Sequence, residues 1–272
     1  MKRISFILCC ILLLGGCTGR PPAPVNNYGG SGGSSFYNTS RNKPPLPGKG
    51  NQTTNNSNRP PLPGQGARNS YSPKAKVVVG SNASGRLSGQ EIFRRCNTAV
   101  FMVFTSTGAA DFQGSGFFIS PDGLAVSNYH VFEGTGVGLE TIKLSNDQQY
   151  KLGDVIFKDK ENDVMVFTVK AAPGTKFNYI PISAHSAQVG DKVYAIGSPR
   201  GLENTFSSGE ISQFRDGGTI LQISVPIDHG SSGGALINEY GEAIGITFGG
   251  FEDSGANLNF AVNISTVKNR LK

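Results

Sequence analysis

Short apolar runs follow one another along residues 99–262. They are four to eight residues long, rich in Val, Ile and Phe, and separated by turns that contain Gly or Asp. Runs of this length and spacing predict roughly a dozen short strands in antiparallel sandwiches or barrels, and they argue against a βαβ fold. The predicted strands cover residues 99–105, 116–120, 124–127, 141–144, 164–169, 192–196, 209–214, 220–224, 235–238, 243–248 and 259–262.

Two short helices are predicted at the ends of this strand-rich region. Ser88-Gly-Gln-Glu91 is a capping box, and Ile92, Phe93 and Cys96 follow it on one apolar side. The chain closes with a second predicted helix from Ile264 to Lys272. Residues 87–272 therefore predict one folded domain that is long enough for a substantial core.

A segment of different composition precedes this domain. Gly, Pro, Asn and Ser fill 40 of the 69 positions in residues 18–86, so too few apolar side chains remain to offset the entropy of ordering. Residues 43–50 (KPPLPGKG) recur as residues 59–66 (RPPLPGQG), and such Pro-rich stretches between flexible ones form a mixed linker. We interpret residues 17–86 as a disordered spacer; the alternative is that the basic repeats bind an aromatic groove or an anionic polymer.

The charge of the chain divides at the same place. The formal net charge is +6, but residues 18–86 carry nine Lys or Arg and no acid, whereas residues 87–272 carry 14 Lys or Arg and all 19 acids. The part that folds is therefore acidic, and the overall positive charge does not indicate binding to nucleic acid. No nucleic acid is expected among the partners.

The first sixteen residues have the pattern of a secretory signal peptide. Lys2 and Arg3 precede an apolar run over residues 4–14, which is too short to cross a bilayer as a helix. Leu14-Gly-Gly-Cys17 resembles the bacterial lipobox, which implies that the thiol of Cys17 takes a lipid; the alternative is an incidental cysteine. We expect an exported domain in the cell envelope, held to a membrane by acyl chains. In Gram-negative bacteria, an Asp after the lipidated cysteine resembles a mark for retention in the inner membrane, so Thr18 at this place favours the outer membrane if the cell is Gram-negative.

One thiol, Cys96, remains in the exported domain. It is expected to be buried and inert; the alternative is pairing with another molecule. The three histidines and this cysteine lack the spacing of metal ligands, and no Gly-rich loop opens a helix to hold phosphate. No metal and no cofactor is expected.

Three separate positions carry candidate chemistry. In residues 228–235, DHGSSGGA, Ser232 lies among glycines, which allow a tight turn to bring backbone N–H groups beside a hydroxyl. His130 follows the predicted strand 124–127, and Asp163 directly precedes the predicted strand 164–169. Taken singly, these are a common loop, an ordinary histidine and a turn aspartate. Together they suggest nucleophilic catalysis.

The order His130, Asp163, Ser232 is the order of catalytic residues in the chymotrypsin fold. Eight motifs in sequence order resemble the protease domain of HtrA (Deg) serine proteases, and the resemblance covers about residues 87–272. It implies an all-β fold of two six-stranded antiparallel β-barrels with the active site between them. The motifs are residues 114–123, 127–131, 163–166, 195–202, 208–212, 230–236, 241–246 and 260–262.

The resemblance also implies roles for residues. Ser232 is the expected nucleophile, His130 the general base and acid, and Asp163 the residue that orients His130. The amides of Gly230 and Ser232 are expected to form the oxyanion hole. A substrate strand is expected to pair along residues 258–261, and their side chains are expected to shape a pocket for small or medium apolar residues. These residues are Leu258, Asn259, Phe260 and Ala261.

This sequence departs from the family pattern in three places. The chain ends at Lys272, so no PDZ domain is expected, and a trimer is implied by the resemblance alone. His229 stands where the family often has Pro or Arg, and Ser231 stands where it usually has Asn. Because residue 231 is not acidic, activation by a new N-terminus is not expected. The position of His229 suggests the hypothesis that this residue makes the oxyanion loop sensitive to pH.

These observations predict a membrane-anchored serine endopeptidase that cleaves envelope or extracellular proteins in extended conformation. A catalytically silent protease-fold binding module is one alternative. An adhesin or scaffold that acts through the Pro-rich segment is another. The presence of all three candidate catalytic residues favours the enzyme.

Overall fold

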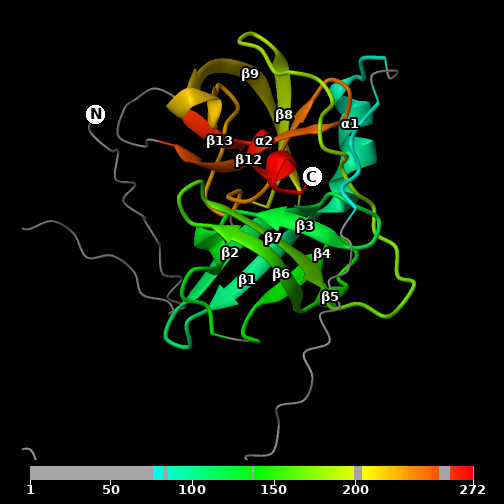
Figure 1. The fold of residues 1–272 in the computed structure, drawn as a ribbon, viewed down its shortest axis with the longest axis vertical. Helices are drawn as coiled ribbons and strands as arrows, with labels where there is room; N and C mark the ends of the chain where they lie inside the picture. The colour runs from blue at the N-terminus through cyan, green and yellow to red at the C-terminus, as the bar shows by residue number, and fades with distance from the viewer. Residues whose placement is uncertain (1–75, 82–84, 137, 199–203, 251–257, 272) are drawn as a thin grey trace, which may run out of the picture. The chain divides into compact units, whose positions relative to one another are not determined.

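The computed structural model describes residues 76–81, 85–136, 138–198, 204–250 and 258–271 (Figure 1). The predicted signal peptide 1–16, Cys17 and most of the predicted spacer lie outside the described residues. Within the described ranges, no helix is long and apolar enough to span a membrane.

The first half of the fold is a seven-stranded antiparallel sheet in the order β5-β4-β1-β2-β3-β7-β6. Its inner face is packed with phenylalanines, among them Phe101, Phe118 and Phe167, whose rings contact one another at centroid distances of 4.8 and 6.4 Å. The strands are β1 (Val100–Ser106), β2 (Asp111–Phe118), β3 (Leu124–Ser127), β4 (Thr141–Leu144), β5 (Gln149–Tyr150), β6 (Leu152–Asp159) and β7 (Val164–Val169).

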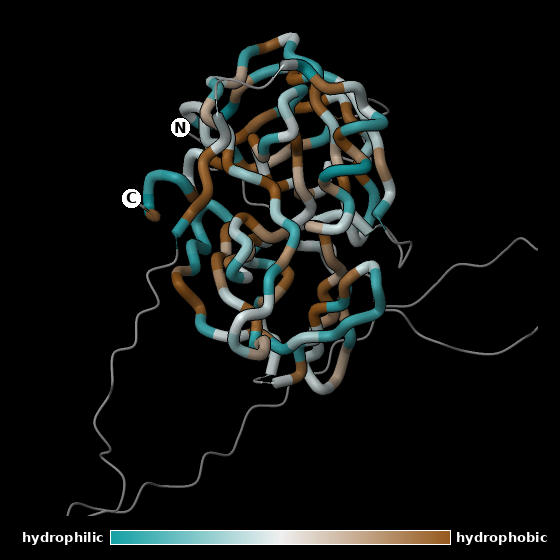
Figure 2. The backbone as a smooth tube through the Cα atoms, turned by 90° about the vertical axis from the view of Figure 1, so that its right-hand side faces the viewer, coloured by the Kyte–Doolittle hydropathy of each residue, from teal (hydrophilic) through white to brown (hydrophobic). Residues whose placement is uncertain are grey.

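The second half is a closed antiparallel barrel in the order β10-β13-β12-β11-β8-β9. Small and branched apolar side chains such as Ala195, Leu221 and Ala261 fill it. Hydrophobic stretches alternate with hydrophilic ones along the chain in both halves (Figure 2). The strands are β8 (Lys192–Gly197), β9 (Thr205–Arg215), β10 (Ile220–Ile223), β11 (Ala235–Asn238), β12 (Ala243–Gly250) and β13 (Asn259–Asn263).

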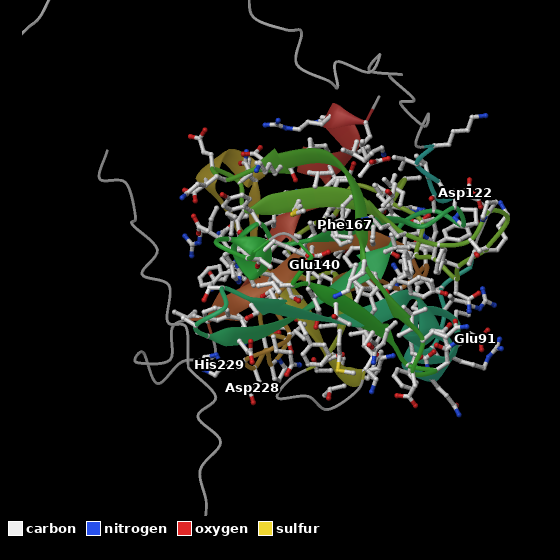
Figure 3. All side chains as sticks on the ribbon, turned by 90° about the horizontal axis from the view of Figure 1, so that it is seen from below. Glu91, Asp122, Glu140, Phe167, Asp228 and His229 are labelled. Carbon is white, nitrogen blue, oxygen red and sulfur yellow. The ribbon has the colours of Figure 1, made fainter. Side chains whose placement is uncertain are left out.

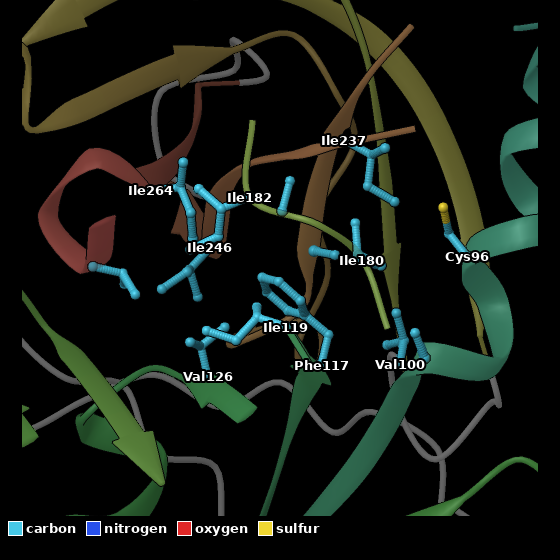
Figure 4. Close-up of a cluster of buried hydrophobic side chains, with 14 of the residues drawn as sticks. Cys96, Val100, Phe117, Ile119, Val126, Ile180, Ile182, Ile237, Ile246 and Ile264 are labelled. Carbon is cyan, nitrogen blue, oxygen red and sulfur yellow. The ribbon is translucent and has the colours of Figure 1, made fainter. Parts of the chain in front are cut away.

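A third apolar cluster joins the two halves. Phe117 and Val126 of the first sheet are fully buried in one cluster with Ile246 of the barrel (Figure 4). Ile196 of the barrel belongs to the same cluster. Because fully burying one such side chain contributes about 1.5–3 kcal/mol, this interface fixes the two halves against each other. The residues where the halves meet are therefore held in a defined arrangement.

The all-β fold class with two barrel-like halves and two short helices is confirmed. The prediction of six strands in each barrel is wrong for the first half, which is a sheet of seven strands with β5 and β6 at its two ends. Both of these strands were missing from the sequence prediction. The second barrel has the predicted six.

The helices agree with the prediction in place and differ in one detail. α1 (Gly89–Cys96) starts as expected, with Ser88 Oγ accepting the N–H of Glu91 at 3.2 Å. The Glu91 carboxylate does not complete the capping box, because it binds Arg94 and Arg95; these hydrogen bonds lower its pKa to about 2. α2 (Ser265–Arg270) ends the described chain. The short 3-10 helices are η1 (Asn97–Ala99), η2 (His130–Phe132) and η4 (Asp216–Gly218).

The folded domain begins earlier than predicted. Val79 forms a parallel bridge with Ile182, and Gly80 N–H donates to Ile182 C=O at 2.9 Å. Val77 packs against the central apolar cluster. The boundary predicted between residues 86 and 87 is therefore wrong, because the run of valines at 77–79 belongs to the folded domain and not to the spacer.

The prediction for Cys96 is confirmed. Its side chain is buried, and burial raises the pKa of the thiol to about 12. At neutral pH the group is a protonated, apolar core side chain.

Candidate active site

Strand pairing brings His130 and Asp163 together. His130 opens η2 three residues after β3 ends, and Asp163 directly precedes β7, which pairs with β3 in the register Ser127 to Met165. Asp163 Oδ2 lies 2.8 Å from His130 Nδ1, and Asp163 Oδ1 accepts the backbone N–H of His130 at 2.9 Å. The carboxylate therefore fixes both the position and the ring orientation of one histidine.

The main chain of Asp163 is itself in an uncommon conformation. Its φ is +53°, in the left-handed region that non-glycine residues seldom adopt. Asn128, which is fully buried, donates its side-chain amide to the C=O of Asp163 at 3.0 Å. Among the described residues, the Oδ1 of Asn128 has no hydrogen-bond partner. Sequence reasoning missed this residue, because a buried Asn between two motif residues carries no signal of its partner.

Two successive tight turns carry Ser232. Ser231 N–H donates to Asp228 C=O at 3.0 Å and closes the first; Gly234 N–H donates to Ser231 C=O at 2.9 Å and closes the second. The third residues of these turns, Gly230 and Gly233, have φ of +91° and +90°. A positive φ at that position alone is the type II turn, which favours glycine. Ser232 is the second residue of the second turn, and it is partly exposed.

The backbone amides of these turns divide into two sets. The N–H groups of Ser231, Gly233 and Gly234 donate to carbonyls of the protein, that of Gly233 to Thr247 C=O at 2.8 Å. Within the described part of the chain, the N–H groups of Gly230 and Ser232 have no acceptor. These are the two amides that the sequence motif marks as a candidate oxyanion hole.

The direction of the Ser232 N–H follows from its peptide group. The carbonyl of Ser231, in the same peptide, accepts the hydroxyl of Thr247 at 2.8 Å as well as the N–H of Gly234. Because C=O and N–H point in opposite directions across a trans peptide, the Ser232 N–H points away from Thr247 and out of the barrel. Such an amide is available to an oxyanion.

β2 lies against both Ser232 and the residue next to His130. The N–H of Ser115 donates to Ser232 C=O at 2.7 Å. A Cβ built on Gly114 lies 2.6 Å from Val131, the neighbour of His130, and 3.2 Å from Ser232 O. The two described side chains, Ser232 and His130, are not hydrogen-bonded to each other. In ligand-free active sites such bonds are often long and tighten with substrate.

His229 and Asp228 lie at the exposed end of the first turn (Figure 3). The N–H of His229 donates to Asp228 Oδ1 at 2.7 Å. The side chain of Asp228 therefore supports the backbone of the residue before Gly230. The hypothesis that His229 makes this turn pH-sensitive stays a prediction.

The expected pairing of substrate along residues 258–261 is wrong for the strand residues. β13 is paired on both edges, with Asn259 opposite Ile223 of β10 and opposite Gly250 of β12. Ala261 is likewise opposite Leu221 and Thr247. A strand with two occupied edges has no backbone groups left for another strand. A contribution of Leu258, Asn259, Phe260 and Ala261 to a pocket through their side chains stays a prediction.

A metal centre has no visible basis in the described residues. No three His, Cys, Asp or Glu side chains gather there closely enough to hold an ion.

One protein-family model matches part of the chain. Residues 114–246 match the sequence model of the trypsin-like peptidase domain family. The matched region begins at the glycine beside Val131 and Ser232 and includes His130, Asp163 and the two turns.

The relatives are named as DegP-like or Do-like proteases. A probable periplasmic serine endoprotease, DegP-like, from Rhizobium meliloti (strain 1021) is 36% identical over 165 residues, 57% of this chain and 32% of that protein. The chloroplastic protease Do-like 1 of Arabidopsis thaliana is 34% identical over 168 residues, 57% of this chain and 37% of that protein. The chain thus matches only about a third of the length of these relatives.

A solved structure agrees with the sequence comparisons. The crystal structure of a serine endoprotease from Yersinia pestis superposes with a TM-score of 0.60 and 28% sequence identity. The match covers 69% of this chain and 67% of that one. It supports the chymotrypsin-like arrangement of two barrels.

Proposed function

We propose that this chain is a serine endopeptidase of the DegP (HtrA) type, with Ser232 as nucleophile, His130 as general base and Asp163 as the group that orients His130. The observation that carries the proposal is the pair of unpartnered amides, Gly230 and Ser232, that flank the candidate nucleophile in two glycine turns. Preorganised donors of this kind supply the largest single part of catalysis in acyl transfer.

The proposed chemistry proceeds in two steps. Ser232 Oγ bonds to the substrate carbonyl carbon while its proton passes to His130 Nε2, and the two amides bind the oxyanion. His130 then gives the proton to the leaving amine, which leaves an acyl-enzyme. Water, deprotonated by the same nitrogen, releases the new carboxyl end and restores Ser232. Asp163, 2.8 Å from Nδ1, stabilises the imidazolium in both steps.

Protein segments in extended conformation are the proposed substrates. β12 continues past the start of β11, and Thr247 bonds both the N–H of Gly233 and the C=O of Gly234 in the second turn. Two residues further, a Cβ built on Gly249 meets no atom within 4 Å. The end of β12, in place of β13, is where we propose that substrate adds as a strand.

The proposed location is the cell envelope. Relatives are named periplasmic DegP-like proteases, and the N-terminal motif at Leu14–Cys17 supports export with a lipid on Cys17. Two or more acyl chains make a stable anchor, whereas one does not. The full chain is expected in the membrane fraction, and Cys17→Ser is expected to shift it out of that fraction.

A trimer is the oligomeric state that the family resemblance implies, and we propose it for this chain. Light scattering of the detergent-extracted chain tests it.

Labelling by a fluorophosphonate tests the enzyme itself. The reagent reacts with an activated serine, so the wild-type chain is expected to be labelled and Ser232→Ala is not. Ser231→Ala is the matched control: it removes the neighbouring hydroxyl and is expected to keep the label. Absence of label from the folded wild type under every condition overturns the proposal and leaves the protease-fold binding module.

A further inference from the structure

Ser115 lies where the two halves of the fold meet beside the candidate active site. It belongs to β2 of the first sheet, opposite Met102 of β1, and it is completely buried. The carboxyl-terminal half contributes the two turns and the end of β8 to its surroundings. Ser115 lies in the motif at residues 114–123, but the sequence gives no role to its hydroxyl.

All polar atoms of Ser115 are hydrogen-bonded. Its hydroxyl donates to Gly230 C=O at 2.7 Å and accepts the N–H of Ser198 at 3.0 Å. Its backbone N–H donates to Ser232 C=O at 2.7 Å. Its carbonyl accepts the hydroxyl of Ser127 at 2.7 Å. One residue of the first half thus binds the carbonyls of both residues whose N–H groups are unpartnered.

The contact is also very close. A Cβ built on Gly233 overlaps Ser115 O and Ser127 Oγ, so only a glycine at 233 lets the turn approach β2. The second turn and Ser115 are therefore in close backbone contact.

We propose that Ser115 is a positioning residue for the oxyanion hole, an inference that rests on the proposed protease function. Gly230 C=O is held by the Ser115 hydroxyl, and the next N–H, of Ser231, is held by Asp228 C=O. This peptide is fixed at both ends, so the direction of the Gly230 N–H depends only on the two backbone dihedrals of Gly230, whose φ is +91°. Without the hydroxyl, this peptide keeps only the hydrogen bond of Ser231 N–H, and the glycine permits other φ values.

This role differs from simple support of the core. Loss of a buried hydroxyl leaves the Gly230 carbonyl and the Ser198 N–H unpaired, which lowers stability in either case. A disordered oxyanion hole also weakens transition-state binding while ground-state binding remains. The two consequences are therefore measured separately.

The test compares Ser115→Ala with Ser120→Ala. Ser120 is also buried in the first half and accepts two backbone N–H groups, of Asp122 and Leu124, both at 3.3 Å, but it does not touch the turns. Each full-length variant is measured for its unfolding midpoint, its second-order rate of reaction with a fluorophosphonate, and kcat and KM on denatured casein. Binding of a peptide boronic acid, which forms a tetrahedral adduct with the serine, gives a fourth readout.

For Ser115→Ala we expect at least about a tenfold slower labelling, below the ~10²–10³ that loss of a hole donor costs. The fall is expected in kcat and in boronic acid affinity, with KM nearly unchanged. Ser120→Ala is expected to lose stability and to keep these rates. Labelling of folded Ser115→Ala at the wild-type rate overturns the inference, as does an equal fall in both variants.

Two other results are informative: a Ser115→Ala chain that does not fold, and a wild type that is not labelled. If Ser115→Ala does not fold, Ser115→Cys takes its place: the thiol is a weak donor, so slower labelling of the folded variant is expected, and wild-type labelling overturns the inference. If the wild type is not labelled, the proposed function fails and the positioning role fails with it. A labelled wild type beside an unaffected Ser115→Ala removes the positioning role alone.

Discussion

Both carboxylate oxygens of Asp163 bind one residue, His130: Oδ1 accepts its backbone N–H at 2.9 Å, and Oδ2 lies 2.8 Å from its Nδ1. Each side chain is only about a quarter exposed, at 28% for Asp163 and 26% for His130. The pair forms because β3 and β7 are neighbours in the sheet.

Replacing Asp163 by Asn tests this relationship. An amide presents one acceptor and one donor, so the His130 tautomer changes, and we expect kcat to fall by about 10³- to 10⁴-fold at neutral pH. The measurement is steady-state hydrolysis of casein by the variant. Asp154→Asn, an exposed carboxylate on β6, is the control and is expected to retain activity. Similar losses in both variants contradict the assignment.

Asn128 is expected to stabilise the main chain of Asp163. Asn128→Ala leaves the partly buried C=O of Asp163 without its donor, and an unsatisfied buried group costs about 1–3 kcal/mol, which is an upper range here. We expect the free energy of unfolding in urea to fall by this amount, together with kcat. Asn146→Ala on an exposed turn is the comparison. An Asn128→Ala chain as stable as the wild type shows that Asp163 holds φ +53° without help.

Gly230→Ala tests whether activity depends on the backbone geometry at Gly230 and not on stability alone. Alanine at φ +91° is strained by about 1–2 kcal/mol, and relief of the strain turns the free amide away. We expect kcat to fall by ~10²–10³-fold. Gly218, with φ +93° and no atom near its Cβ position, is the matched control: Gly218→Ala is expected to lose similar stability and keep its activity. Equal activity of the two variants contradicts the oxyanion assignment.

Glu242 is expected to make stability depend on acid pH. Its carboxylate is buried, and burial raises its pKa, but hydrogen bonds from His185, Asn238 and Ser183 outweigh burial and lower the pKa below the ordinary 4.5. A pKa lowered by folding means that stability is present above the unfolded value and is lost as pH falls through the folded one.

Thermal unfolding from neutral pH to about pH 3 measures this loss. Glu242→Gln is expected to be less stable at neutral pH and to show a flatter decline on the acid side. Glu161→Gln, at an exposed turn, is expected to follow the wild-type curve. Parallel curves for Glu242→Gln and the wild type contradict the assignment of the acid dependence to this carboxylate.

His229 gives the last prediction. It precedes Gly230 in the first turn, and we expect the pH–rate profile between about pH 5.5 and 7.5 to differ between the wild type and His229→Ala. A flat wild-type profile that His229→Ala leaves unchanged contradicts the hypothesis.

The strands that sequence reasoning located best are the most regularly apolar ones. β3, β4, β7 and β11 were predicted with their observed ends, and β3 and β11 are buried at every position. β6 was missed because half-buried and exposed residues, including Asp154 and Lys158, interrupt its pattern. Two irregularities in its pairing with β7, from Leu152 to Phe157, break the period of two on which strand prediction depends.

The sequence motifs were sufficient to name His130, Asp163 and Ser232 and to place glycines where turns need a positive φ, because conformational freedom and chemical type belong to the residue itself. The sequence also placed the basic, acid-free segment before the domain. The structure was needed to show that residues 77–80 belong to the domain, that β13 has no free edge, and that Asn128 and Ser115 bind the candidate site. These facts depend on partners up to about a hundred residues away. A backbone group has the same chemistry everywhere, and only the packing of distant strands determines whether its hydrogen bond is taken or left open.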